Sequence, residues 1–155
     1  MLNFSDILVV SIENAVAAPM CSMRFADAGA RVIKIEPSGG ETARNYDETV
    51  LGESAYFASL NRGKESMILN LRNSDDIALL RRILAKTDVF LRNTAPGAME
   101  RIGLDAGILC REFEHLIVID ILGYGQGTDY QDMKAYDLLV QAVDLKLKIK
   151  NLKVQ

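Results

Sequence analysis

The feature that most constrains the fold of this chain is an alternation of short apolar runs with segments of helical periodicity. Five runs have the length and the content of valine and isoleucine that are typical of buried strands. These expected strands are residues 7–12, 31–36, 66–71, 88–91 and 116–122. Because the segments between them have helical patterns, the sequence predicts βαβ units. We therefore expect an α/β fold with a doubly wound parallel sheet.

Capping and turn residues mark the boundaries of the expected helices. Pro19 lies where a first helix can begin, because proline fits the first helical turn, and Gly29 suits a left-handed helix end. Asn73 or Ser74 is the expected N-cap of the helix after the third strand, and two acids follow where the helix dipole favours them. The other expected helices are residues 55–61, 97–103 and 105–113.

Charge and cysteine content exclude several classes of function. A net charge of −3 gives no reason to expect a nucleic-acid or anionic membrane partner. No apolar run approaches the roughly 20 residues of a membrane span, and Asp6 interrupts a start that lacks the basic segment of a signal peptide. Cys21, Cys110 and the single histidine lack the spacing of a zinc site. We therefore expect a cytoplasmic protein without a metal.

The turn after the first strand is a candidate nucleotide site. A βαβ start suggests dinucleotide binding, and Glu36 ends the second strand where a ribose-binding acid would lie. The turn reads ENAVAAPMCS, however, and lacks the G-x-G-x-x-G pattern that lets the backbone approach a pyrophosphate. NAD and FAD are therefore disfavoured. The small Ala15, Ala17 and Ala18 leave room for a flat ligand, or they simply pack the start of the helix.

Six sequence blocks resemble the family III CoA-transferases, also called the CaiB/BaiF family. In order they read VAAPMCSMRFADAGARVIKIE, GETARNYD, SAYFASLNRGKESMILNL, NTAPGAMERIGL, IDILGYGQGTDY and AYDLLVQA, within residues 7–142. The family includes formyl-CoA, carnitine and dicarboxylate CoA-transferases and alpha-methylacyl-CoA racemases. The resemblance implies the N-terminal portion of a large Rossmann-like domain, with coenzyme A or an acyl-CoA and a small carboxylate as substrates. It also implies interlocked homodimers for full-length relatives.

The resemblance further implies which residues meet coenzyme A. Val16 and Ala17 match positions of the first turn that contact the adenosine. The segment at the end of the third strand matches residues that approach the nucleotide with backbone groups and a basic side chain. That segment consists of Leu69, Asn70, Leu71 and Arg72. Another segment matches residues that pass near the pantetheine and the reaction centre. It consists of Lys134, Ala135, Tyr136 and Asp137.

Two further matches follow the fourth strand. Asn93 matches the asparagine of the family motif N-[FY]-x-P-G, although Thr94 replaces the aromatic residue and puts stacking there in doubt. Arg101 matches an arginine that binds a CoA phosphate. Arginine pairs with phosphate through two parallel hydrogen bonds, and Arg72 and Arg101 follow strand ends, where ligands of open α/β sheets bind. For either arginine taken alone, a solvated surface charge is the favoured interpretation, whereas within the matching motifs phosphate binding is favoured.

The resemblance favours transfer chemistry over racemisation. Racemases of the family carry a histidine at the position of Tyr136, and a phenol with a pKa of about 10 rarely acts as a base near neutral pH. Tyr136 could also be a packed aromatic residue. The family's nucleophile is an aspartate that forms an aspartyl-CoA thioester. It matches a segment beyond the end of this chain, so no catalytic residue is assigned here.

The last residues differ in composition from the rest. Residues 1–143 are expected to form an incomplete CoA-binding domain, whereas residues 144–155 alternate leucine with four lysines and contain no arginine. We interpret this tail as sequence foreign to the family; the alternative is an amphipathic strand. Two functions remain open: the CoA-binding portion of a transferase, inactive by itself, or a non-catalytic remnant or pseudoenzyme that binds coenzyme A.

Overall fold

A computed structural model describes residues 3–125, 127–131 and 133 of the chain. The chain divides into two compact units, Met1–Ile121 and Leu122–Gln155. The named helices and strands belong to the first unit. In the described part of the second unit, Gly127 N donates a hydrogen bond to Gln131 Oε1, and the rings of Tyr124 and Tyr130 lie 5.8 Å apart. Within the described ranges, no helix is long and apolar enough to cross a membrane.

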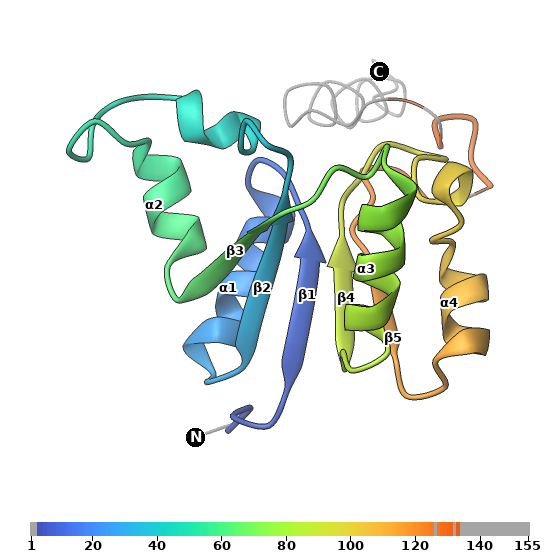
Figure 1. The fold of residues 1–155 in the computed structure, drawn as a ribbon. Helices are drawn as coiled ribbons and strands as arrows, with labels where there is room; N and C mark the ends of the chain where they lie inside the picture. The colour runs from blue at the N-terminus through green and yellow to red at the C-terminus, as the bar shows by residue number, and fades with distance from the viewer. Residues whose placement is uncertain (1–2, 126, 132, 134–155) are drawn as a thin grey trace, which may run out of the picture. The chain divides into compact units, whose positions relative to one another are not determined.

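The described residues form a five-stranded parallel sheet with the order β3-β2-β1-β4-β5 (Figure 1). Its strands are β1 (Leu8–Ile12), β2 (Arg31–Glu36), β3 (Lys64–Ile68), β4 (Val89–Arg92) and β5 (Ile117–Asp120). The expected parallel α/β sheet is confirmed. The chain runs outward from β1 to β3, then crosses to β4 on the other side, which is the doubly wound arrangement.

The third strand was expected over residues 66–71, but β3 begins two residues earlier, at Lys64, and ends at Ile68. Leu69 N still donates to Glu36 O at 3.0 Å, but Asn70 N donates to the carboxylate of Asp76 at 2.7 Å. That hydrogen bond turns the backbone from the sheet toward the next helix. The segment 69–72 is therefore a loop at the carboxyl edge of the sheet rather than the end of a strand.

Helices lie on both sides of the sheet: α1 (Ala17–Asp27), α2 (Ala55–Asn61), α3 (Ser74–Leu84) and α4 (Ala106–Glu112). Asn73 is the N-cap of α3, since its side chain accepts a hydrogen bond from Asp75 N at 2.8 Å. Helix α1 starts two residues before Pro19, which still falls in the first turn, and Gly29 follows its end with a φ of 99°.

The helix expected over residues 97–103 is only a short 3-10 turn, η2 (Glu100–Ile102). Gly97 has a φ of 70°, and this left-handed backbone cannot continue into a right-handed helix. Gly103, with a φ of 71°, ends the turn. Arg101 therefore lies in a compact turn between β4 and α4.

Two apolar layers enclose the sheet. On one face, Val10 and Phe90 pack with Leu80 and Leu84 of α3 and Leu109 of α4. On the other face, the strand residues Val9, Val32 and Val89 form a smaller cluster against Phe25 and Ala26 of α1. Alternate residues of each strand thus enter different layers, as the pleat of a β-strand requires.

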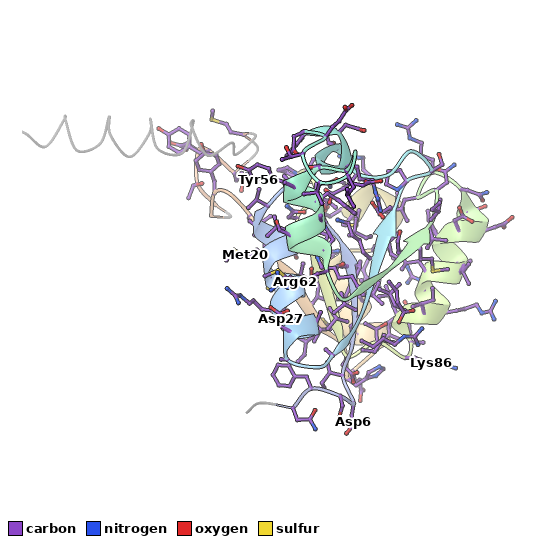
Figure 2. All side chains as sticks on the ribbon, turned by 90° about the vertical axis from the view of Figure 1, so that its left-hand side faces the viewer. Asp6, Met20, Asp27, Tyr56, Arg62 and Lys86 are labelled. Atoms are coloured by element: carbon purple, nitrogen blue, oxygen red, sulfur yellow. The ribbon has the colours of Figure 1, made fainter. Side chains whose placement is uncertain are left out.

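Helices α1 and α2 are neighbours on the face of the smaller cluster. Arg62, just after α2, reaches Asp27 at the end of α1, with 2.7 Å between Arg62 Nη2 and Asp27 Oδ2 (Figure 2). The 3-10 turn η1 (Thr42–Asn45) precedes α2 and packs near it. Elements α1, η1 and α2 therefore cover the side of the sheet on which the charged residues described below are buried.

Candidate functional site

A pocket of about 410 Å³ opens at the carboxyl ends of β1, β2 and β3. Its apolar wall consists of Ile12, Ile35, Leu69 and Leu71. Its remaining lining residues are Glu36, Pro37, Ser38, Asn70 and Arg72. Open α/β sheets bind their ligands at this edge. An apolar wall with a few polar groups and an arginine at the rim suits a flat aromatic group that carries a phosphate.

The structure brings the predicted segment 69–72 together in this pocket. Arg72 N donates to Asn70 Oδ1 at 3.1 Å, so the side chain of Asn70 shapes the loop itself. Arg72 is exposed, and within the described part of the chain it takes part in none of the ion pairs. Its guanidinium is therefore available to an incoming anion.

The predicted residues Val16 and Ala17 lie at the turn between β1 and α1. Val16 is the N-cap of α1 and is 41% exposed, and Ala17 is the first residue of the helix. Neither lines the pocket, but Ile12, the last residue of β1, does. The turn thus begins directly at the pocket wall.

Asn93 fixes the backbone of this turn from the side of β4. Its Oδ1 accepts a hydrogen bond from Asn14 N at 2.8 Å, and its Nδ2 donates to Asn14 O at 2.9 Å. The side chain expected to meet coenzyme A is therefore engaged with the protein's own backbone in this structure. Sequence reasoning placed Asn93 correctly after a strand but did not anticipate its pairing with Asn14.

Arg101 is not among the residues that line the pocket. It is exposed on η2, and its backbone N–H donates to Gly97 O at 3.2 Å. Among the described residues it makes none of the ion pairs. The predicted residues Lys134, Ala135, Tyr136 and Asp137 lie outside the described residues. In the described ranges no cluster of histidine, cysteine and acidic side chains could hold a metal ion.

Glu36 is held by the protein itself rather than open to a ribose. Its carboxylate accepts hydrogen bonds from Arg44 Nη2 at 2.7 Å, Ser66 Oγ at 2.6 Å and Glu41 N at 3.2 Å. Burial alone raises the pKa of this carboxyl, but these hydrogen bonds outweigh burial and lower the pKa to about 2. The guanidinium of Arg44 also stacks on Phe57, 3.8 Å from the ring centroid. Glu36 therefore anchors η1 to the sheet.

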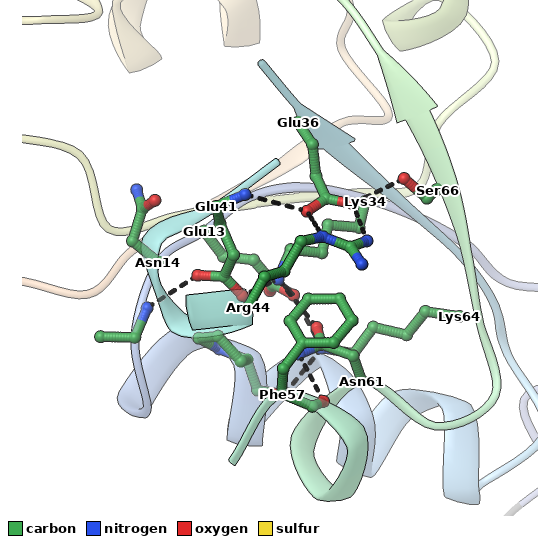
Figure 3. Close-up of polar contacts among 12 residues, drawn as sticks. Glu13, Asn14, Lys34, Glu36, Glu41, Arg44, Phe57, Asn61, Lys64 and Ser66 are labelled. Carbon is green, nitrogen blue, oxygen red and sulfur yellow. Dashed lines mark hydrogen bonds and ion pairs between the residues drawn. The ribbon is translucent and has the colours of Figure 1, made fainter. Parts of the chain in front are cut away.

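A second group of buried charges was missed by the sequence reasoning. Lys34 of β2 and Lys64 of β3 meet the carboxylates of Glu13 and Glu41, and each of these side chains is at most 2% exposed (Figure 3). A detectable signal was present in the sequence. Inner strands of parallel sheets are almost continuously apolar, so Lys34 and Glu36 in the inner strand β2 indicate ion pairs beneath a helix.

Comparisons with known proteins identify the family to which this chain belongs. The profile of CoA-transferase family III matches residues 4–144, which is most of the chain. The fold is that of an α/β protein with its pocket at the carboxyl edge of a parallel sheet. The chain belongs to CoA-transferase family III.

Individual relatives agree with this assignment. The chain is 38% identical over 141 residues to an acetyl-CoA:oxalate CoA-transferase of Acetobacter aceti, covering 90% of this chain and 36% of that protein. It is 31% identical over 137 residues to the succinyl-CoA:glutarate CoA-transferase of Homo sapiens, covering 87% and 31% respectively. The crystal structure of a CaiB/BaiF family protein from Brucella suis has a TM-score of 0.84 and 31% identity, covering 90% of this chain and 38% of that one. The chain thus spans about one third of the length of these relatives.

Proposed function

We propose that this chain supplies the CoA-binding part of a CoA-transferase that moves coenzyme A between an acyl-CoA and a small carboxylate or dicarboxylate. The observation that carries the proposal is the pocket at the carboxyl edge, which is lined by residues 69–72 of a chain that belongs to CoA-transferase family III. Relatives named for oxalate and glutarate support a small dicarboxylate as the acceptor. The free Cys21 and Cys110 suit a cytoplasmic enzyme.

The chemistry of coenzyme A fits the residues at this edge. An adenine ring is flat and apolar on its faces, so it suits the wall of Ile12, Ile35 and Leu71. The 3′-phosphate and pyrophosphate of coenzyme A require cations outside that wall. Arg72 at the rim and Arg101 on η2 are exposed arginines whose planar guanidinium groups match phosphate oxygens. The turn at Val16 and Ala17 lies on the adenosine side of this arrangement.

The reaction itself is assigned to the whole protein. By resemblance, a carboxylate of an aspartate attacks the thioester carbonyl, and the C–S bond breaks to give a mixed anhydride and CoA thiolate. The thiolate then attacks the aspartyl carbonyl and releases the first acyl group as a carboxylate. The resulting aspartyl-CoA thioester passes coenzyme A to the second carboxylate by the reverse steps. We assign that aspartate to a segment outside this chain, and Tyr136 in place of a histidine favours transfer over racemisation.

Calorimetric titration with coenzyme A tests the binding site. We expect Arg72→Ala and Arg101→Ala each to weaken binding about ten- to a hundredfold, because a charge-assisted contact with phosphate contributes about 1.5–3 kcal/mol. Arg82→Ala is the matched control, since Arg82 is an exposed arginine on α3 outside the pocket lining. Unchanged affinity in both Arg72→Ala and Arg101→Ala would show that the site is wrongly assigned.

A further inference from the structure

The β1–α1 turn is attached to a buried network of four charged side chains. Lys34 Nζ donates a hydrogen bond to Glu41 Oε1 and lies 3.7 Å from Glu13 Oε1. Lys64 Nζ donates to Glu13 Oε1 at 2.7 Å. Both lysines also donate to Asn61 Oδ1, at 2.8 and 3.0 Å. Two cations and two anions therefore balance beneath α1, η1 and α2 (Figure 3).

Such a network is not required for stability alone. Removing two ammonium groups and two carboxylates from water is costly, and apolar residues of similar volume often give equal or greater stability. The opposite face of the same sheet shows that apolar packing serves this fold, since Val10, Phe90 and Leu80 are fully buried there. The charged network therefore has a role beyond stability if it fixes the position of another group.

The network holds one specific backbone group. The second oxygen of Glu41, Oε2, accepts a hydrogen bond from Ala15 N at 2.9 Å. Ala15 has a left-handed backbone with a φ of 62°, which is unfavourable for a residue with a Cβ atom and persists only where the surroundings enforce it. Asn93, which follows β4, makes two hydrogen bonds with the backbone of the preceding residue, Asn14. The turn is thus fixed from η1 and from β4 at once.

We propose that Glu41 is a positioning residue for the coenzyme A site, which holds the β1–α1 turn by accepting a hydrogen bond from the Ala15 N–H while Lys34 orients its carboxylate. This inference rests on the proposed function, because Val16 and Ala17 directly follow Ala15 and are the residues that would contact the adenosine. If Ala15 is released, these two residues lose their fixed position relative to the pocket wall at Ile12. Glu41 itself touches no substrate in this assignment.

A carboxylate is needed at position 41 because two donors face it. Lys34 Nζ and Ala15 N approach different oxygens of Glu41, and a glutamine offers only one oxygen. In Glu41→Gln the ammonium of Lys34 takes that oxygen, so the amide NH₂ faces the Ala15 N–H and the turn loses its acceptor. Replacing Lys34 at the same time frees the glutamine oxygen to turn toward Ala15.

Two double variants test this reasoning without leaving a charge imbalance in the network. Lys34→Met/Glu41→Gln retains an acceptor for Ala15, whereas Lys34→Met/Glu41→Leu does not. Lys64 remains paired with Glu13 in both. The two measurements are amide hydrogen exchange at Ala15 by NMR and coenzyme A affinity by calorimetry. Relative to Lys34→Met/Glu41→Gln, the variant Lys34→Met/Glu41→Leu should lose at least about tenfold in protection of the Ala15 amide from exchange and about tenfold in affinity for coenzyme A.

The single variant Glu41→Gln should resemble Lys34→Met/Glu41→Leu in both measurements, although it differs from the parent chain only by an NH₂ group in place of one carboxylate oxygen. Asp120→Asn is the control for loss of an ion pair on the opposite face of the sheet, since Asp120, whose side chain is 32% exposed, pairs with the buried Arg92 at 2.5 Å. It should lower stability while leaving Ala15 protection and coenzyme A affinity within about twofold.

Three results would overturn the proposal or its premise. Equal Ala15 protection in the two double variants would show that Glu41 does not hold the turn. Lost protection with unchanged affinity would show that the position of the turn is irrelevant to binding. If the parent chain bound no coenzyme A, the proposed function and the role of Glu41 in binding would both fail, while the exchange data would still report whether Glu41 fixes Ala15.

Discussion

Several charged residues of this chain act as internal connectors rather than as surface groups. Glu36 is 2% exposed and joins Arg44 of η1 to Ser66 of β3, while Lys34 and Lys64 join the strands to Asn61 at the end of α2. Burial lowers the pKa of Lys64, and the carboxylate of Glu13 opposes this. At the residue scale, hydrogen bonds to charged groups thus attach η1 and α2 to strands β2 and β3.

The depressed pKa of Glu36 predicts a pH dependence of stability. Its folded pKa is about 2 and its ordinary value is 4.5, so its contribution is complete above about pH 4.5 and is lost as the pH falls toward 2. Glu36→Gln should therefore be less stable than the parent chain at pH 7, by about 1–3 kcal/mol. The difference should shrink between pH 4.5 and 2 in urea denaturation experiments.

Glu65→Gln is the matched control for this measurement. Glu65 also pairs with an arginine, at 2.8 Å from Arg31 Nε, but both side chains are more than half exposed. Exposed pairs contribute at most about 1 kcal/mol, so this variant should show a smaller effect. A difference between Glu36→Gln and the parent chain that stayed constant from pH 7 to 2 would contradict the role given to the Glu36 carboxylate.

The pocket is formed at the ends of secondary-structure elements. Strand β3 stops at Ile68, the loop 69–72 lines the pocket, and α3 begins at Ser74 under the cap of Asn73. Asn73 N donates to Asn70 O at 2.8 Å, and Asp76 in the first turn accepts from Asn70 N. At the element scale, the start of α3 therefore determines the shape of the loop that carries Arg72.

Removing the cap of α3 should weaken the helix. Asn73→Ala deletes the acceptor for Asp75 N, and loss of an N-cap typically costs about 1 kcal/mol. We expect this decrease in the free energy of unfolding from urea denaturation monitored by circular dichroism. Ser74→Ala is the control, because Ser74 is the first helical residue rather than the cap. An equal loss in both variants would show that the capping interaction is not what stabilises this end.

At the scale of the whole molecule, the described fold covers about one third of the length of its curated relatives. The strand β5 has an exposed Ile117, at 59%, on an edge of the sheet. Among the described residues, each carboxylate of the pocket and of the buried network is paired with a cation and is at most 2% exposed. Glu13 pairs with Lys64 through Oε1, and its Oε2 is buried without a hydrogen-bond partner. Glu36 is held by Arg44 and Ser66, and Glu41 by Lys34 and Ala15.

The 155-residue polypeptide alone should therefore bind coenzyme A without transferring it. A misplacement of about 1 Å in a reacting group can reduce a rate a hundredfold, so a neighbouring acid does not replace a positioned aspartate. The measurement is incubation with succinyl-CoA and a panel of small dicarboxylates, followed by mass spectrometry. A preparation of the Arg72→Ala variant controls for contaminating transferase. Sustained formation of a new acyl-CoA by the parent chain alone would place the nucleophile within these residues.

Local sequence patterns determined most of the fold. Valine- and isoleucine-rich runs predicted five strands, because such residues suit a sheet buried on both faces, and their alternation with helices implied parallel pairing. Caps at Asn73 and a left-handed Gly29 placed helix ends within one or two residues. The same reasoning failed at residues 97–103, where the positive φ of Gly97 interrupts a pattern that otherwise favours a helix.

Tertiary structure alone decided how the site is held. The sequence predicted that residues 69–72 form the end of a strand. The hydrogen bond from Asn70 N to Asp76, which instead bends them into a pocket wall, depends on the packing of α3. The contacts of Glu41 with Ala15 and of Asn93 with Asn14 join residues 26 and 79 positions apart. Propensity and periodicity describe neighbours along the chain, whereas these partners meet only when parallel strands bring their carboxyl ends to one edge.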